Sequence, residues 1–488
     1  MTRSTLLACL LVFFHLAVIA QHQKKLLTLG DAVSLARGQS QASLLAETQK
    51  ENRFWQWRTY KSNYLPQLGL SGTLPNFNRS FTPVTQPDGT TEFQPVSINN
   101  SDVQLSLTQS IGLTGARLFA SSEVNRFDDF DNDVIRYSGS PFFIGVMQPL
   151  FGFNPLKWDR EIEPLLFDES KKEYVEELED ISNETTGLFF DMLLAQITLE
   201  ISNKNVASND TILKIGQGRY QLGKIAENDL LQLELNLLNS EQEVAQATLD
   251  LETSQLRLKT YIGITGNELI GLELPAELPQ FQIDEEIAVT EARKNRQEAV
   301  AFQRRALQAQ RDVAEARGNN GLNADLFATF GFSNRANNLR DIYSNPDDQQ
   351  RIRIGFDIPI LDWGRQKSIV KTAEANQKLV EYTIAQDEVN FDQEVITQVK
   401  QFDMLRNQVA VSHQADDIGQ RKYEITKNRY LIGKISITDL NLALKDKDEA
   451  KRTYIQSLRD FWIAYYNIRK LTLFDFEKNQ TLYNEVEE

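Results

Sequence analysis

The seven residues 219–225, Arg-Tyr-Gln-Leu-Gly-Lys-Ile, return almost unchanged at residues 429–435 as Arg-Tyr-Leu-Ile-Gly-Lys-Ile. The shift between the two stretches is 429 − 219, or 210 residues, and the same shift relates Pro149 to Pro359. Each stretch ends one long run of helical periodicity and precedes another. We therefore predict a tandem duplication of one large unit, because similarity at a fixed spacing is the signature of a repeated structural element.

The first copy is longer than the second. Residues 64–70, Tyr-Leu-Pro-Gln-Leu-Gly-Leu, correspond to residues 320–326, Asn-Gly-Leu-Asn-Ala-Asp-Leu, with a shift of 322 − 66, or 256. The first copy thus carries 256 − 210, or 46, additional residues. These predict one further hairpin, formed by residues 112–126 and 140–148. The sequence leaves open whether this hairpin adds strands to a barrel or forms a surface flap.

The N-terminus predicts export. Arg3 precedes an apolar stretch at residues 6–19, and small residues lead to an expected cleavage after Ala20. This pattern is typical of a secretory signal peptide and is too short for a spanning helix, which needs about 20 residues. Cys9, the only cysteine, lies inside that stretch, so the mature chain would have no disulfide, and we expect no lipidation.

Composition excludes several classes of function. A net charge of −16 and a pI near 4.9 argue against nucleic-acid binding, which calls for a basic surface. The chain has three histidines and one cysteine, too few for a His/Cys metal or nucleophilic site. Residues 218–224 match the spacing of a phosphate-binding loop, but they follow a helix where that loop requires a strand. We expect no catalytic residue, no metal and no cofactor, and hence no enzyme.

Two hairpins of long helices are predicted, from residues 159–219 and 228–262 and again from residues 365–428 and 436–469. Apolar residues recur in them at narrow helical spacing with Glu, Gln and Asn between. Such a stripe requires a neighbouring helix, as in a coiled coil.

Short segments between the helices alternate apolar and polar residues, which predicts strands. Residues 103–108 and 351–360 alternate most regularly, and the latter place apolar side chains at every even position through Ile358 and Ile360. Residues 67–71 and 322–332 repeat the pattern. A soluble sheet with one face on a core would also alternate, so this pattern alone does not decide between a soluble and a membrane sheet.

An export signal, few strands per copy and no helix of matching length to cover them favour a membrane barrel. Open strand edges are not tolerated in hydrocarbon, so several chains would have to close one barrel. Arg351, Arg353 and Asp357 would then point into the barrel lumen, although solvated strand charges without a selectivity role are the alternative.

The chain resembles the TolC-type outer-membrane efflux proteins. The resemblance rests on the two Arg-Tyr-x-x-Gly turns with Asp229 and Asp439 after them, on residues 148–151, and on residues 465–473 near the end. It covers essentially the whole mature chain. It implies an α+β membrane protein with two tandem structural repeats per chain, in which a trimeric outer-membrane β-barrel is continued by a long periplasmic α-helical coiled-coil tunnel.

The resemblance also implies partners and a site. A homotrimer would export small molecules, drugs or secreted polypeptides across the outer membrane with a periplasmic adaptor and an inner-membrane transporter, and its barrel would contact lipid. The turns would lie at the periplasmic tip, where the adaptor docks. The tip residues are Arg219, Tyr220, Gly223, Lys224, Arg429, Tyr430, Gly433 and Lys434.

Asp229 and Asp439 have two interpretations. By the resemblance they would line the periplasmic aperture, while their residue type also suits a cap on the first turn of a helix. Well-known members of the family carry a second acidic ring and a basic partner where this chain has Leu442 and Ile435. A doubled acidic constriction and its salt-bridge latch are therefore doubtful here.

We accordingly expect a signal peptide at 1–20, repeat 1 at 21–262, a linker at 263–282, repeat 2 at 283–470 and a C-terminal segment at 471–488. Within the repeats, strands are expected over about 64–153 and 320–362. The alternative function is a periplasmic coiled-coil adaptor or scaffold without a pore, and an exported hydrolase has no catalytic constellation in its favour. The sequence does not identify the substrate, the pump or the adaptor.

Overall fold

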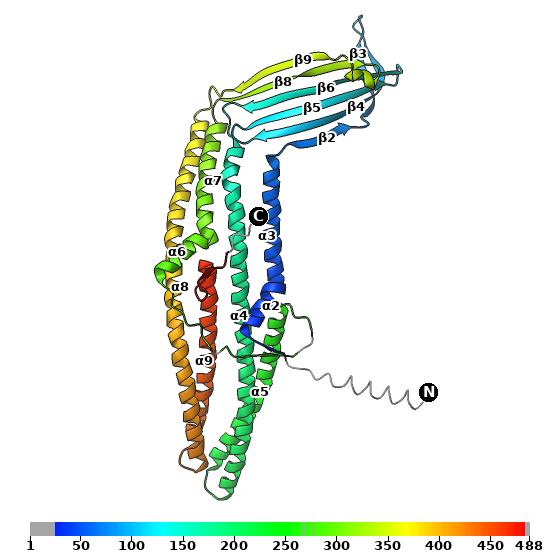
Figure 1. Ribbon diagram of the computed structural model, residues 1–488. Coiled ribbons are helices and arrows are strands. Elements are labelled where there is room, and N and C mark those ends of the chain that lie inside the picture. The colour runs from blue at the N-terminus through cyan, green and yellow to red at the C-terminus, as the bar shows by residue number, and fades with distance from the viewer. Residues whose placement is uncertain (1–24, 267–268, 276, 484–488) are drawn as a thin grey trace, which may run out of the picture. The chain divides into compact units, whose positions relative to one another are not determined.

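The computed structural model describes residues 25–266, 269–275 and 277–483. The expected signal peptide, with Cys9, lies outside these residues. Long helices and one large sheet make up the described chain (Figure 1). None of its described helices combines the length and the apolar character needed to cross a membrane.

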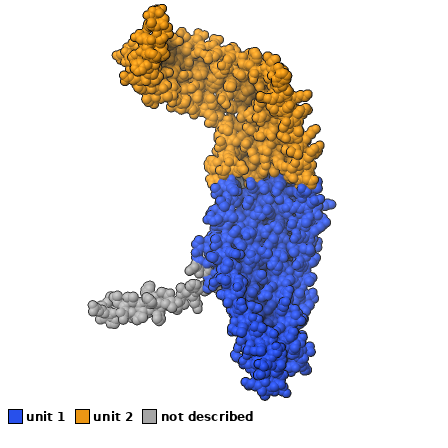
Figure 2. Space-filling model, turned by 180° about the vertical axis from the view of Figure 1, so that it is seen from behind, with its two compact units in different colours: residues 1–50, 171–299, 389–488 blue, residues 51–170, 300–388 orange. Residues whose placement is uncertain are grey.

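The chain forms two compact units, shown in different colours in Figure 2. Unit 1 comprises residues 1–50, 171–299 and 389–488, and unit 2 comprises residues 51–170 and 300–388. Each unit draws segments from both expected repeats. The compact units therefore cut across the duplication, and a repeat is not an independent domain.

The helical hairpins recur at the shift of 210. They are α4 (Pro155–Gln221) with α5 (Glu227–Tyr261), and α8 (Arg365–Leu431) with α9 (Ile437–Thr472). Both α4 and α8 have 67 residues, which corresponds to about 100 Å of helix. The start of α8 is displaced from that of α4 by 365 − 155, and the start of α9 from that of α5 by 437 − 227; both differences equal 210.

The shorter helices recur at the other shift. They are α2 (Leu29–Gln39) with α3 (Gln41–Asn63), and α6 (Glu285–Asn295) with α7 (Gln297–Asn319). Their starts differ by 285 − 29 and 297 − 41, both 256. The sequence similarity extends to these helices, since residues 32–37, Ala-Val-Ser-Leu-Ala-Arg, correspond to residues 288–293, Ala-Val-Thr-Glu-Ala-Arg.

The large sheet lies in unit 2 and is antiparallel throughout. In spatial order it consists of β2 (Gln67–Thr73), β4 (Thr91–Ile111), β5 (Ala116–Asp129), β6 (Val134–Pro149), β8 (Asn323–Ala336) and β9 (Asp347–Asp357). A seventh strand, β3 (Phe77–Thr85), follows β2 along the same side of β4 (Figure 1). The 3₁₀ helix η1 (Leu339–Tyr343) connects β8 to β9.

Two details of the strand prediction are corrected. The last strand ends at Asp357, so Ile358 and Ile360 lie beyond it in spite of their alternation. Pro359 explains this end, because proline has no N–H for the ladder and constrains the residue before it. The additional hairpin is longer than predicted and forms β5 and β6, two strands of the same sheet between β4 and β8.

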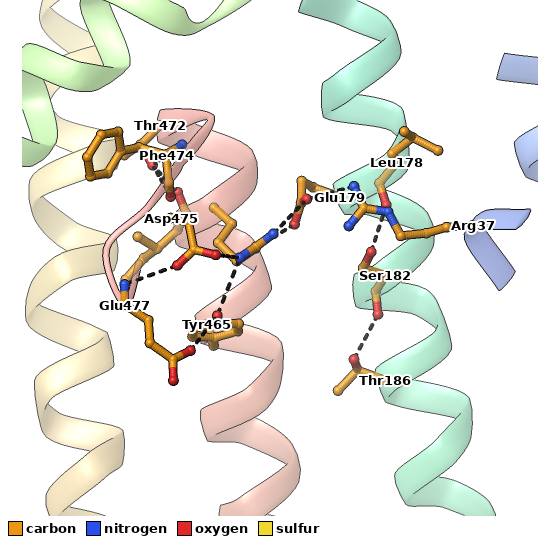
Figure 3. Close-up of polar contacts among 12 residues, drawn as sticks. Arg37, Leu178, Glu179, Ser182, Thr186, Tyr465, Thr472, Phe474, Asp475 and Glu477 are labelled. Carbon is orange, nitrogen blue, oxygen red and sulfur yellow. Dashed lines mark hydrogen bonds and ion pairs between the residues drawn. The ribbon is translucent and has the colours of Figure 1, made fainter. Parts of the chain in front are cut away.

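Two small sheets and a buried network of ion pairs connect segments of the chain within unit 1. The parallel pair β1 (Lys25–Leu27) with β7 (Ile270–Leu272) and the antiparallel pair β10 (Phe474–Asp475) with β11 (Gln480–Thr481) both belong to this unit. The Glu179 side chain on α4 is fully buried and accepts hydrogen bonds from Arg37 of α2 and Arg469 of α9. Arg469 also donates to Asp475 of β10, so one network ties four elements together (Figure 3).

Candidate functional site

Both hairpin turns end their first helix in the same way. Gly223 and Gly433 have positive φ of 67° and 77°. Gly223 donates its N–H to the carbonyl of Tyr220, and Lys224 donates to that of Arg219, both at 2.8 Å. The second turn repeats these bonds at 2.9 Å. This pair of backbone hydrogen bonds defines a Schellman motif, in which glycine adopts the left-handed conformation at no steric cost.

The two equivalent tyrosines have different surroundings. Tyr220 is exposed, while Tyr430 is 5% exposed and belongs to an apolar cluster at this end of the hairpins. The other buried members are Ile212, Leu233, Tyr423, Ile437 and Leu440. Since this cluster takes residues from α4, α5, α8 and α9, it packs the two hairpins against each other within unit 1.

Arg219 joins the two turns directly. Its guanidinium lies over the Tyr430 ring, 5.4 Å from the centroid, and donates to the carbonyls of Tyr430 at 3.1 Å and of Leu431. These carbonyls are at the C-terminus of α8, where the helix dipole favours a positive charge. Its counterpart Arg429 is exposed. Sequence similarity did not reveal this difference, because the two turns are nearly identical.

The two aspartates also differ. Asp439 accepts hydrogen bonds from the Ser436 N–H and Oγ at 3.2 and 2.8 Å, and the Ser436 Oγ accepts from the Asp439 N–H. This is a capping box at the start of α9. At the start of α5 the equivalent position is Ala226, which provides no side-chain cap. Asp229, half-buried in the first turn of α5, therefore has no such capping partner.

The pKa of the Asp439 carboxyl is lowered, mainly by the hydrogen bonds from Ser436. The group is exposed and is charged at neutral pH. The capping role and the aperture role both require an ionised Asp439. The capping role is observed in the structure, while the aperture role stays a prediction. Only Asp439 was considered as a cap from the sequence, and the pair formed by Ser436 with the acidic residue three positions later is the signal that identifies the capping box.

One face of the sheet is apolar and exposed. Its members include Leu68, Leu70, Leu107, Leu118, Ile144, Phe330, Ile352, Ile354 and Phe356. Ile352, Ile354 and Phe356 on β9 are 77%, 62% and 73% exposed. Branched and aromatic side chains of this size are normally removed from water, so a face like this marks a surface that binds another apolar phase.

The other face carries Arg351, Arg353 and Asp357, as the alternation predicts. It also carries a row of aromatic residues that sequence reasoning missed. The Arg353 guanidinium lies 5.3 Å from the centroid of the Phe327 ring, and Phe327 stacks on Phe119 at 5.9 Å. Charged side chains and rings therefore share this face.

Within the described residues, no group of three or more His, Cys, Asp or Glu side chains is placed to hold a metal ion. The chemistry of the candidate surfaces is that of charge, hydrogen bonding and apolar contact.

Comparison with known proteins identifies the family. The profile of the outer membrane efflux protein family matches residues 32–264 and 288–472. No curated protein matches the chain.

Several solved structures share the fold. The Campylobacter jejuni CmeC outer membrane channel has a TM-score of 0.66 and 18% identity, over 93% of this chain and 87% of that one. The Vibrio cholerae outer membrane protein VceC has a TM-score of 0.62 and 14% identity, over 91% of this chain and 95% of that one. The Neisseria gonorrhoeae MtrE outer membrane channel, solved in an open state, has a TM-score of 0.59 and 14% identity, over 91% and 88%.

The resemblance stated from the sequence is thus confirmed, since the profile spans both copies and the similar structures cover nearly the whole chain. This chain belongs to the outer membrane efflux protein family.

Proposed function

We propose that this chain is the subunit of a homotrimeric outer-membrane channel that exports small molecules, drugs or secreted polypeptides from a Gram-negative cell. The observation that carries the proposal is the sheet with one exposed apolar face and a charged opposite face. Lipid is the phase that such a face requires, because apolar-out and polar-in alternation is the pattern of membrane barrel strands.

Closure of the barrel supports the trimer. The strands β2 with β3 and the strand β9 are the two edges of the sheet, and their backbone groups need partners inside hydrocarbon. Pairing β9 of one copy with the opposite edge of the next satisfies both edges at once. Closed rings of identical subunits are the usual outcome of such head-to-tail contacts.

Partners are proposed at the hairpin turns. Leu222 and Ile432 are 74% and 66% exposed beside Lys224 and Lys434. Exposed apolar side chains at the end of a helical hairpin suit a protein partner. We assign this end to a periplasmic adaptor, through which an inner-membrane transporter would deliver the substrate.

Electron microscopy of the protein extracted from outer membranes, together with current recordings in planar bilayers, tests the proposal. We expect threefold particles with a central pore and stepwise currents. Solid or monomeric particles without currents would instead support a periplasmic scaffold, the alternative that the helical hairpins alone would allow.

The aperture is tested separately with Asp229→Asn and Asp439→Asn. If the carboxylates face one another around the threefold axis, each change should weaken the preference for cations, since rings of acidic side chains select cations. Ser436→Ala is the matched control, because it removes the cap of α9 and retains the Asp439 charge. Selectivity unchanged in both Asn variants would leave Asp439 with its capping role only.

A further inference from the structure

We propose that the hairpin β5–β6 widens the membrane barrel, so that its outer mouth admits solutes up to roughly 25 Å across, as estimated below from strand number and tilt. This inference rests on the proposed function, since it requires three chains around one barrel.

One pair of adjacent strands in the first copy has no counterpart in the second. The shift of 256 relates β2 to β8 and the shift of 210 relates β6 to β9, which makes four strands in the duplicated frame. In the second copy β9 is followed directly by α8, whereas in the first copy β5 and β6 come between β4 and α4. The chain therefore offers 4 + 2, or six, strands side by side.

Continuous pairing places the hairpin in the wall of the sheet. The β4–β5 ladder extends from Ile98 opposite Asp129 to Ile111 opposite Ala116. The β6–β8 ladder extends from Tyr137 opposite Ala336 to Pro149 opposite Asp325. Two full strands thus separate β4 from β8, and a flap lying over the surface would leave β4 and β8 free to pair with each other.

The side chains of the hairpin continue both faces. Leu118 and Ile144 lie between Leu107 of β4 and Phe330 of β8, and all four are 42% to 49% exposed on the apolar face. A surface flap would have no reason to continue the apolar band in register. The hairpin therefore has the pattern of wall strands.

A specific contact locks the hairpin to β8 on the charged face. The Phe119 ring of β5 crosses β6 and stacks on Phe327 of β8 at 5.9 Å. It can do so because Gly145 lies between them, where a Cβ would collide with the Phe119 ring and with Thr329. Glycine inside a strand here serves close approach, which is one of its established uses.

Strand β6 of the hairpin also contains a β-bulge. β6 has one residue more than β5 between Ser140 and Phe143, and one more than β8 between Gly139 and Phe142. The common extra residue falls at or next to Pro141, which cannot donate to the ladder. Bulges bend strands and increase twist, which barrel closure requires.

The width follows from strand number. With strands about 4.8 Å apart and tilted by about 40°, twelve strands close at a backbone diameter of about 24 Å and eighteen at about 36 Å. Allowing about 5 Å for the side chains on each wall, half of the ~10 Å spacing between packed sheets, leaves about 14 Å and about 26 Å. Three copies of the frame alone would make the narrow barrel, and three copies of this chain the wide one.

The strand count in trimers of the full chain, imaged in lipid nanodiscs, tests the inference. A closed barrel of eighteen strands is expected. A trimeric barrel of twelve strands with β5 and β6 outside the wall would overturn the widening and leave the channel intact. A particle without a closed barrel would overturn the proposed function instead, so the two failures are distinguishable.

Polymer exclusion gives a second measurement. Neutral polyethylene glycols of graded size, added on the extracellular side of a bilayer, should lower the single-channel current up to a hydrated diameter of roughly 25 Å, the width derived above. A variant lacking residues 113–148 should exclude polymers wider than about 14 Å. If the variant does not assemble, the cutoff of the full chain decides alone, and a cutoff near 14 Å would contradict the inference.

Discussion

At the scale of single residues, the two nearly identical turns differ in how the following helix begins. Ser436 and Asp439 form a capping box at α9, whereas Ala226 gives α5 no side-chain cap. The backbone of Ala226 is already extended, with φ −80° and ψ 158°, which suits a capping residue. One methyl group in place of a hydroxymethyl group therefore separates the two helix starts.

Ser436→Ala should destabilise the first turn of α9 by about 1 kcal/mol, and Ala226→Ser should stabilise that of α5 by a similar amount. Amide hydrogen exchange of residues 437–440 and 227–230 measures this, with an expected change of about fivefold in opposite directions. Equal exchange in the parent and both variants would show that tertiary packing alone holds these turns.

Glu176 on α4 titrates in an unusual range. Its side chain is 7% exposed, and burial, followed by the charge of Glu298, raises its pKa from 4.5 to about 7. Arg296, whose Nε lies 3.6 Å from the carboxylate, opposes the rise. In the unfolded chain the carboxyl group releases its proton first as pH rises, so the folded state loses stability between about pH 4.5 and about pH 7.

Glu176→Gln removes this titration, because glutamine carries no ionisable group. The thermal midpoint of the parent should fall relative to that of the variant as pH rises from 5 to 8, by the equivalent of up to about 3 kcal/mol. Glu184→Gln, an exposed position on the same helix, is the control and should track the parent. A constant difference between Glu176→Gln and the parent across this range would contradict the raised pKa.

At the scale of elements, the network around Glu179 connects α2, α4, α9 and β10 within unit 1. Arg469 has an 11% exposed side chain and bridges Glu179 on α4 to Asp475 on β10, both of which are buried (Figure 3). Arg37, on α2, contacts the same Glu179 at 3.0 Å but is 29% exposed. Removing Arg469 would therefore take a cationic partner from two buried carboxylates, whereas removing Arg37 would take one from Glu179 only.

Arg469→Met should destabilise the protein by about 3–5 kcal/mol, because it leaves two buried carboxylates with reduced compensation. Arg37→Met should cost clearly less, since Arg469 still neutralises Glu179. Thermal unfolding of the two variants in the same detergent makes the comparison, and equal losses would mean that the network is not centred on Arg469.

At the scale of the whole molecule, the proposed membrane location rests on the two faces of the sheet. Ile354 and Gln349 are on opposite faces of the single strand β9, and both are exposed. A positive charge on a lipid-facing strand position costs about 2–4 kcal/mol near the bilayer midplane, whereas lumen positions tolerate it.

Ile354→Arg should therefore lower the yield of assembled protein in the outer-membrane fraction, while Gln349→Arg should leave it near the parent level. Membrane fractionation followed by native gels measures both. Similar yields for the two variants would mean that the apolar face does not contact lipid.

Some elements were predicted from the sequence more accurately than others. The long hairpins and their glycine turns were predicted to within a few residues, because helical periodicity and the Arg-Tyr-x-x-Gly pattern are local. The strand β3 and the distal part of β4 fall inside the expected strand region 64–153 but were not delimited as strands, since residues 77–99 include polar stretches and three prolines without clear alternation. Their pairing depends on neighbours, and local pattern does not contain it.

The amino-acid sequence by itself determined the duplication, the helical hairpins, the alternating faces of the strands and the family. Each of these follows from periodicity or from residue types that act on their immediate neighbours. Only the tertiary structure decided that β5 and β6 stand inside the sheet, that Arg219 crosses to the end of α8, and that Tyr220 and Tyr430 differ in burial. The physical reason is that these contacts join residues far apart in the chain, where identical sequence motifs meet different surroundings.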